Sequence, residues 1–554
     1  MFSGIRAHGM RIAGIAALAS ILAICAPVFA FAAEGEEQPA LYATAFAAVP
    51  PLLAIVLSLI TKEVYSSLFL GVLAGGVLYS GFDFSTFMNH VMIDGIVGSL
   101  SDPSNSGILV FLVILGMLVA MMNLSGGSAA FGRWASTKVK TRRGSQFSAI
   151  LLGILIFVDD YFNCLTVGSV MKPLTDQYDV SRAKLAYIID ATAAPVCILA
   201  PISSWAAAVS GFVEGENGLE IFIRAIPYNF YALLTIVMMF MIVAMNFDYS
   251  KMAVYERNAV EDGDLFTIRD NTNNTTEEEV NEKGRVLDLV FPVVVLIISC
   301  IIGMIYTGGF FSGTSFVDAF AGCDAATSLT LGSSVALVIS IIYYTARRVV
   351  SFRDCMNCVP EGFKQMAAPI LVLTLAWTLK VMTDSLGLAD FVANLVDQMP
   401  DNLIVLIPAA LFLIACALGI ASGTSWGTFG ILIPIALAIT ESRPDLMIVV
   451  ISACMAGGVC GDHCSPISDT TIMASAGAGA NHISHVETQF PYALTVLSIS
   501  TVCYVIAGIL ESPWIALIVG IVALYGTLRF FKSRPGSYVV DEQKAIELAK
   551  KYRA

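Results

Sequence analysis

Residues 108–131 read ILVFLVILGMLVAMMNLSGGSAAF, and residues 370–391 read ILVLTLAWTLKVMTDSLGLADF. Each stretch contains enough apolar residues to cross a hydrocarbon core of roughly 30 Å as a helix. The two stretches also resemble each other, which indicates that one unit occurs twice in the chain. They therefore predict an all-α polytopic membrane protein with an internal repeat.

The composition of the whole chain agrees with this prediction. Its 554 residues are 57% hydrophobic and 13% charged, with a mean hydropathy of +0.79, whereas soluble domains carry about 25% charged residues. The net charge is −13, and the sequence shows no basic surface of the kind that nucleic-acid binding requires. Most of the twelve cysteines lie in apolar segments, so no disulfide framework is expected. Membrane lipid is therefore an expected partner, and nucleic acid is not.

Loop charges give the orientation of the predicted spans. If 147–171 and 403–439 each leave the membrane on the side that they entered, nearly every loop lysine and arginine becomes cytoplasmic, and Arg224 and Arg443 lie outside. This asymmetry follows the positive-inside rule, and it predicts an inner-membrane protein with residue 34 outside and a cytoplasmic C-terminus. The predicted spans are 41–61, 66–81, 106–123, 225–246, 287–306, 329–345, 366–383, 491–510 and 513–529.

The repeated unit continues beyond the two quoted stretches. Each is followed by a predicted hairpin and then by an interrupted segment with a Pro-Ile-Ser element, at 201–203 and 466–468. The first copy opens with a helix that runs inward and the second with a helix that runs outward. Two inverted-topology repeats, each with a re-entrant hairpin and an interrupted helix, are typical of secondary transporters with a binding site near the midplane.

Domain limits follow from this pattern. Residues 41–246 and 287–530 are the two predicted transmembrane repeats, 247–286 is an acidic cytoplasmic linker and 531–554 is a cytoplasmic tail. Residues 1–33 have the arginines, apolar run and small residues of a signal peptide, and an uncleaved first helix is the alternative.

The first hairpin tip places two adjacent aspartates in apolar surroundings. A charged residue at the bilayer centre costs at least ~2.5 kcal/mol, and a cation bound by carboxylate and carbonyl oxygens would offset that cost. The alternative for one of these aspartates is a structural role, as the N-cap of the next helix. The second tip has small hydroxyl residues and a tryptophan, which suit either close approach to an ion or a helix contact. The candidates at the two tips are Asp159, Asp160, Asn163, Ser422, Thr424 and Trp426.

The interrupted segments carry further candidates. Their prolines and glycines open backbone carbonyls, and a buried aspartate can exchange a bound cation for a proton. His463 is either a sensor of pH or a structural histidine. The first segment contributes Asp190, Thr192, Ser203 and Ser204, and the second contributes Asp462, His463, Ser465, Ser468, Asp469 and Thr470.

Lys380 is a basic residue well inside the predicted span 366–383. Asp384 follows four residues later on the same helix face, so a structural ion pair is one interpretation. The other is a charge that pairs with a substrate carboxylate or substitutes for a coupling ion.

Two motifs carry a resemblance to a known family. GTSWGTFGILIPIA at 423–436 and GDHCSPISDTTIMASAGAGANHISHVETQFPYAL at 461–494 resemble the NhaC-type sodium/proton antiporters, a family that also contains malate/lactate exchangers and amino-acid carriers. The resemblance covers nearly all of 41–530. It implies two inverted repeats, and it implies that Asp462, Ser465, Ser468, Asp469 and Thr470 line the ion site. It implies that Asp159, Asp160 and Asn163 have a similar role in the first half.

The leading hypothesis is therefore a secondary active transporter that exchanges Na+ for H+ by alternating access at these aspartates. The alternative is a sodium- or proton-coupled carrier of a small carboxylate or amino acid. Channels and membrane enzymes are disfavoured, because no nucleophile, base and orienting group can be assigned. No cofactor is expected beyond the transported Na+ and H+. A small organic solute and a homodimer stay open as further partners.

Overall fold

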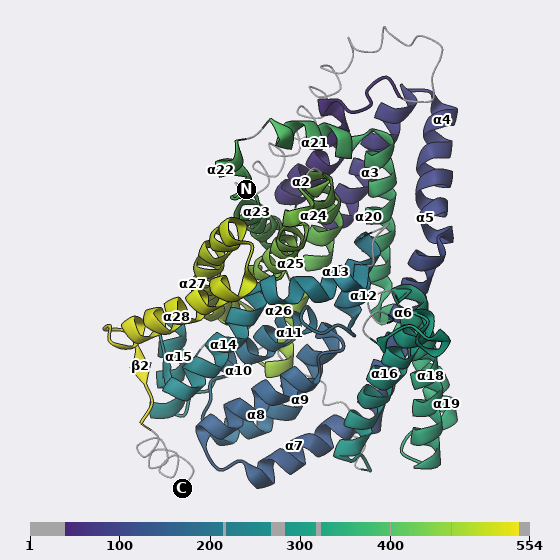
Figure 1. The fold of residues 1–554 in the computed structure, drawn as a ribbon. Coiled ribbons are helices and arrows are strands. Elements are labelled where there is room, and N and C mark those ends of the chain that lie inside the picture. Colours follow the sequence, from purple (N-terminus) through teal and green to yellow (C-terminus); the bar gives the residue numbers. More distant parts are fainter. Residues whose placement is uncertain are drawn as a thin grey trace, which may run out of the picture.

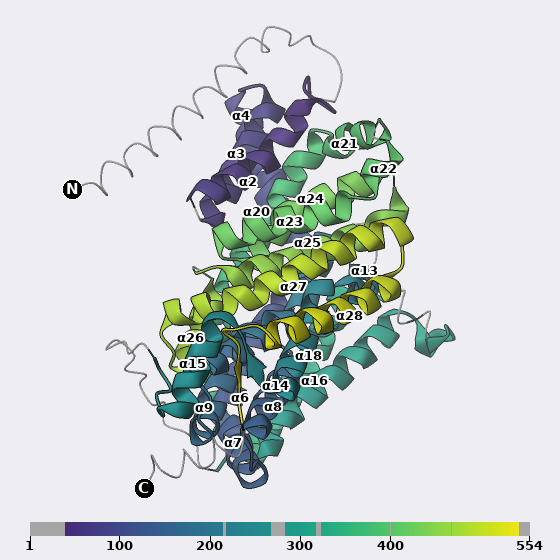
Figure 2. The same ribbon diagram turned by 90° about the vertical axis from the view of Figure 1, so that its left-hand side faces the viewer.

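A computed structural model of the chain describes residues 39–541, except for 62, 214–217, 268–282, 317–318, 320–322, 399, 442 and 467. The described secondary structure is almost entirely helical (Figures 1 and 2). Its one sheet is the antiparallel pairing of β1 (Phe247–Asp248) with β2 (Tyr538–Val539). The predicted signal peptide or first helix lies outside the described residues. The prediction of a mostly helical chain is confirmed.

Long apolar helices make this a multi-span membrane protein. Within the described residues, six helices are long and apolar enough to cross a membrane, and two bent helix pairs bring the number of spans to as many as eight. The six are α6 (Pro103–Ser125), α16 (Val286–Thr307), α18 (Ala325–Ala346), α25 (Met447–Cys464), α27 (His482–Leu510) and α28 (Pro513–Lys532). The bent pairs are α13 (Gly218–Ala225) with α14 (Phe230–Met245), which meet at 48°, and α19 (Phe352–Gln365) with α20 (Ala367–Ser385).

The predicted spans 41–61 and 66–81 correspond to shorter helices. These are α2 (Val49–Thr61), of 13 residues, and α3 (Val64–Ser80), of 17 residues. The remaining short elements are η2 (Ala45–Ala48), α4 (Phe84–Met88), η3 (Asn89–Val97), α5 (Gly98–Ser101), α7 (Gly127–Lys138), η4 (Ile226–Tyr228), α15 (Ser250–Glu261), η5 (Phe310–Ser312), α21 (Leu388–Asp397), α22 (Asp401–Ile404) and η6 (Pro444–Leu446).

Both predicted hairpins are pairs of helices that contact each other. The first consists of α8 (Arg142–Leu155) and α9 (Asp160–Gln177), and the second of α23 (Ile407–Ser422) and α24 (Ser425–Thr440). Asp159 caps α9 and Thr424 caps α24, each through its side-chain oxygen. Gly423 adopts φ +68°, which ends α23 at the second tip. The tips therefore lie where the sequence predicts the chain to turn.

The interrupted segments are broken helices. In the first, α10 (Arg182–Thr192) and α11 (Ala194–Cys197) precede a non-helical stretch that ends at α12 (Ser204–Phe212). In the second, α25 ends at Cys464 and α26 (Asp469–Ala478) resumes after Pro466. Ser203 and Ser468, the serines of the two Pro-Ile-Ser elements, cap α12 and α26. Proline interrupts each helix, and the serine starts the next one.

Elements from the two ends of the chain interleave. Helix α6 packs against α16, α18 and α19, while α20 packs against α3 and η3 (Figure 1). Helix α26 packs against both α9 and α10. There Gly168 and Gly477 bring two backbones together, since a Cβ on Gly168 would lie 2.4 Å from the Gly477 carbonyl carbon. The first hairpin therefore contacts the second broken helix directly.

Part of the predicted linker is folded. Residues 250–261 form α15, which packs on α27 and buries Glu256 against Arg142 at the start of α8. Asp248 in β1 accepts hydrogen bonds from Lys184 of α10 and Tyr492 of α27. The acidic stretch 268–282 lies outside the described residues.

Candidate functional site

The first hairpin tip separates its two aspartates into different environments. Asp159 Oδ1 accepts the Phe162 N–H at 2.9 Å as the cap of α9, and its Oδ2 accepts the Ser204 hydroxyl at 3.4 Å. Asp160 is equally buried, but its Oδ1 has no hydrogen-bond partner among the described residues. Asp159 therefore has the capping role, and Asp160 has an oxygen available for a ligand.

The second half contributes another buried carboxylate. Asp462 Oδ2, near the end of α25, accepts the Ser425 hydroxyl at 3.0 Å and the Thr470 hydroxyl at 3.4 Å. Ser425 opens α24 and Thr470 lies in the first turn of α26, where its hydroxyl is 2.9 Å from that of Ser468. Three elements of the second half therefore meet at one carboxylate.

Several contacts join these two clusters. The thiol of Cys164 donates to the Thr470 carbonyl at 3.6 Å, from α9 to α26. The rings of Trp205 and Trp426 lie 6.1 Å apart at the starts of α12 and α24. The carboxylate of Asp160 interacts electrostatically with that of Asp462 and faces the indole N–H of Trp205. The hairpin tips and the helix breaks thus converge on one buried region.

The described part of the chain contains no cluster of three or more His, Cys, Asp or Glu side chains suited to a metal ion. The donors in this region are carboxylates, hydroxyls and backbone carbonyls instead. Ser425 and Thr470 donate their hydroxyl protons to Asp462, so the lone pairs of their oxygens remain for a cation. Such oxygen donors suit a hard cation that is bound weakly enough to leave.

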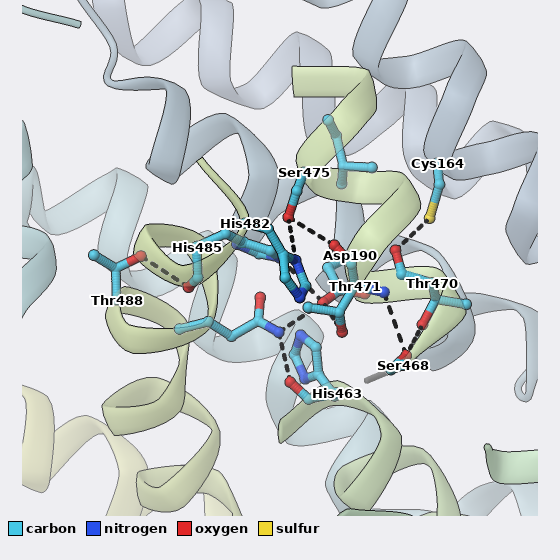
Figure 3. Close-up of polar contacts among 12 residues, drawn as sticks. Cys164, Asp190, His463, Ser468, Thr470, Thr471, Ser475, His482, His485 and Thr488 are labelled. Carbon is cyan, nitrogen blue, oxygen red and sulfur yellow. Dashed lines mark hydrogen bonds and ion pairs between the residues drawn. The ribbon is translucent and has the colours of Figure 1, made fainter. Parts of the chain in front are cut away.

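A third buried carboxylate lies in a different set of partners. Asp190 Oδ2 accepts the Gln489 amide at 2.6 Å, the Thr471 hydroxyl at 3.0 Å and His485 Nε2 at 3.3 Å (Figure 3). The Gln489 amide also donates to the His463 carbonyl at 2.5 Å. The structure therefore brings Asp190 together with α26 and α27 rather than with the first hairpin tip.

Other predicted residues make local hydrogen bonds. Asn163 Nδ2 donates to the carbonyls of Gly153, Ile156 and Thr192, which ties the first tip to α10. The hydroxyls of the remaining candidates bond to nearby carbonyls: Thr192 to Ile188 and Ile189, Ser203 to Cys197 and Ala200, Ser422 to Leu418, and Ser465 to Ile420. These side chains hold the breaks and tips in shape.

The remaining predicted residues are exposed or have other hydrogen-bond partners. Asp469 is exposed at the start of α26. Lys380 forms an ion pair with Asp384 at 2.7 Å, in agreement with the structural interpretation of this pair. The Nδ1 atom of His463 lies 2.7 Å from the Tyr231 hydroxyl, so its ring is held by α14.

A comparison with family models identifies the chain. Residues 209–509 match the model of the Na+/H+ antiporter family. The chain belongs to the Na+/H+ antiporter family. It is therefore a membrane transporter and not an enzyme, as the sequence predicts. The matched range of this antiporter family contains Ser425, Asp462 and Thr470 as well as His485 and Gln489, whereas Asp160 and Asp190 precede it.

Relatives agree with membership of the Na+/H+ antiporter family. An uncharacterized protein of Haemophilus influenzae is 37% identical over 479 residues, which cover 83% of this chain and 90% of the relative. The malate-2H(+)/Na(+)-lactate antiporter of Bacillus subtilis is 29% identical over 99 residues, which cover 18% of this chain and 21% of the relative.

A solved structure shares the fold. The YdaH transporter of Alcanivorax borkumensis matches this family member with a TM-score of 0.50 at 12% identity, covering 83% of this chain and 98% of that one. At this identity the likeness shows the fold alone: a mostly helical, multi-span membrane protein with broken spans.

Sequence reasoning about this Na+/H+ antiporter family member missed four residues near the carboxylates: Trp205, Thr471, His485 and Gln489. His485 and Gln489 stand four residues apart on α27, so they share a helix face. That spacing was the available signal, but nothing local in α27 identifies Asp190 as their partner.

Proposed function

We propose that this protein exchanges Na+ for H+ across the bacterial inner membrane, with Asp160 and Asp462 as the shared binding site of the cation and the proton. One observation carries the proposal: Asp160 Oδ1 is buried without a partner beside a second buried carboxylate. Two buried carboxylates repel each other unless a cation or a proton lies between them. Either occupant relieves the same repulsion, so one can replace the other.

Hydroxyl groups around Asp462 support sodium as the cation. Ser425 and Thr470 supply neutral oxygens next to the carboxylate. Loss of Na+ leaves two negative charges in a buried region, which favours uptake of a proton. The exchange needs no permanently charged basic residue.

Alternating access follows from two inverted repeats, which we propose for 41–246 and 287–530. The matched order of hairpin and broken helix in the two ranges supports this arrangement. Rocking of one repeat against the other would open the site to each side in turn. A cysteine in place of Gln177, the last residue of α9, should then react with an impermeant reagent from the cytoplasmic side only. The native cysteines of the described part are buried, so their background labelling should be low. Labelling from outside would refute the re-entrant hairpin.

Purified protein in liposomes with an internal pH-sensitive dye tests the proposed exchange. Addition of external Na+ should alkalinise the lumen, and Asp462→Asn should abolish this response while the variant still inserts and elutes as a single species. A sodium response that is unchanged in Asp462→Asn would overturn the shared site.

Carriage of a small carboxylate is a second candidate, favoured by a separate observation. The indole N–H of Trp426 is buried without a hydrogen-bond partner among the described residues. A cation cannot accept a hydrogen bond from this N–H group, whereas a carboxylate can. A thermal-shift screen of small carboxylates and amino acids, with and without Na+, tests this function. Stabilisation that requires both the solute and Na+ would support it.

A further inference from the structure

We propose that Asp190 and His485 form a second proton-binding centre, separate from the Asp160 and Asp462 site, so that each transport cycle carries one proton more than the cation replaces. This inference rests on the proposed sodium/proton exchange. It gives α27, which carries His485 and Gln489, a part in proton transport.

The position of Asp190 between the two halves supports this assignment. Asp190 lies in α10 of the first half, while its three partners belong to α26 and α27 of the second half: Thr471, His485 and Gln489. By contrast, Asp462 accepts hydrogen bonds from Ser425 and Thr470 of its own half. Movement of one half against the other would therefore change the surroundings of Asp190 more than those of Asp462.

The hydrogen bonds show how this centre holds charge. A carboxylate oxygen that accepts three hydrogen bonds is well stabilised as an anion. His485 contributes Nε2–H to Asp190, and its Nδ1 is buried with no partner in the described part of the chain. In the neutral ring Nδ1 is an acceptor, so it can take a proton and form an imidazolium beside the carboxylate. One proton converts a buried anion into a neutral ion pair.

Gln489 connects this centre to the cation site. Its amide nitrogen donates to both Asp190 and the His463 carbonyl, so the orientation of the amide is fixed by two acceptors. The carbonyl belongs to the residue after Asp462, at the broken end of α25. Thr471, another partner of Asp190, is likewise adjacent to Thr470, which donates to Asp462. A shift of either centre therefore moves the backbone of the other.

Other ionisable groups lie near Asp190 and His485, but none of those described takes the place of His485 as the imidazole bonded to Asp190. His485 is the one imidazole in hydrogen-bond contact with Asp190 among the described residues. The ring of His463 is hydrogen-bonded to Tyr231 and stacks on Tyr187. The groups that face Asp190 electrostatically are Cys164 of α9 and Asp462, His463 and Cys464 of α25. His482 of α27 is engaged with Ser475 and the Pro466 carbonyl instead.

The cycle then gains a defined proton step. While the halves are in contact, the Asp190 carboxylate stabilises a proton that Nδ1 of His485 has taken from water on one side. When the halves separate toward the opposite side, the imidazolium loses this carboxylate and releases the proton to water there. One Na+ moves one way and two protons move the other way, so one net charge crosses the membrane in each cycle.

The coupling ratio of the full chain in liposomes tests the inference. The Na+ gradient that just balances a set pH gradient, measured at two membrane potentials, gives the number of protons exchanged per Na+. We expect a ratio of two for the native protein. In His485→Gln, an amide keeps a donor near the carboxylate but cannot titrate, and we expect a ratio of one with sodium-dependent exchange retained. His482→Gln, on the same helix, is the matched control, and its ratio should remain two.

Each outcome bears on the inference. A native ratio of one, or a ratio of two in His485→Gln, overturns the second proton while leaving the sodium/proton exchange intact. If His485→Gln fails to insert, the native ratio decides alone. Absence of any sodium-driven proton movement in the native protein overturns the proposed function and the second proton together.

Discussion

The two halves of the molecule use acid and hydroxyl groups in opposite places. In the first half the hairpin tip carries the acids, Asp159 and Asp160, and the broken helix carries Ser204, which donates to Asp159. In the second half the hairpin tip carries Ser425, which donates to Asp462 in the broken helix. The scaffold repeats, but the charges do not occupy repeated positions.

This difference shows that two similar arrangements of hairpin and broken helix can differ in where their acids lie. If the positions of Ser204 and Ser425 were acidic as well, more charge would be buried there than one cation can neutralise. With the positions exchanged, one acid of each half lies near the other, and each half retains a hydroxyl donor. The cap of α9 is an acid and the cap of α24 is a threonine, so the capping position is also unequal in charge.

The sharpest test of the comparison removes one acid from each half. Asp160→Asn and Asp462→Asn should each lower sodium-dependent proton flux by at least ~100-fold, since a loss of about 2.7 kcal/mol in binding corresponds to that factor. Proteoliposome assays measure the flux, and size-exclusion elution checks folding. Asp469→Asn is the control, because this aspartate is exposed, and it should retain most of the flux. Normal flux in either buried variant would contradict the equal roles of the two halves.

A second test concerns stability at the base of the first hairpin. Arg142, the first residue of α8, is buried in an ion pair with Glu256, which also accepts the Ser181 N–H at 2.9 Å. Arg142→Met should lower the free energy of unfolding by about 3–5 kcal/mol, because it leaves a buried carboxylate without its counter-charge. Lys251→Met breaks the exposed pair with Glu487 and should cost at most about 1 kcal/mol. Denaturant unfolding in mixed micelles compares the two variants, and equal losses would show that the first hairpin needs no anchor.

The hydroxyl donors give a smaller and graded effect. Ser425→Ala should weaken apparent sodium affinity about 10-fold, since a hydrogen bond to a charged group contributes roughly 1.5–3 kcal/mol. Ser204→Ala should weaken it less, because the Ser204 bond is longer, at 3.4 Å, and ends on the capping residue Asp159. Sodium titrations of proton flux measure both. A larger effect of Ser204→Ala would reverse the roles assigned to the two tips.

The smallest effect is expected at Lys380. Its ion pair with Asp384 lies on one face of α20 and is half open to the surroundings. Lys380→Met should change sodium-dependent flux by less than about twofold, as surface pairs contribute little. If the flux instead disappears, a basic residue of the second half takes part in the exchange and the comparison of acids and hydroxyls is incomplete.

Local signals predicted the framework of this protein, and long-range contacts escaped prediction. Apolar runs, loop charge and the Pro-Ile-Ser elements located both hairpins and both breaks, because each depends on a few neighbouring residues. The i, i+4 spacing of Lys380 and Asp384 likewise predicted their contact. Family membership, which two motifs indicated, is confirmed.

The partners of Asp190 show where sequence reasoning stopped. Thr471 and Gln489 are 281 and 299 residues away from Asp190 along the chain. Thr471 stands two residues after Asp469, and Gln489 stands two residues before Pro491, but these local features do not identify Asp190 as their partner. Their role comes from the packing of α10 against α26 and α27, which is a property of the whole fold.

The pairing of β1 with β2 has a consequence for biosynthesis. Asn246 and Val540 exchange hydrogen bonds beside this pairing, and Asp248 in β1 also holds Lys184 and Tyr492. The segment that follows α14 leaves the ribosome long before the strand that completes it. Throughout translation of the second half β1 therefore lacks its partner strand, and the pairing can form only after residues 538–540 have been made. The order of synthesis therefore makes the pairing of β2 with β1 a late step in the folding of this transporter.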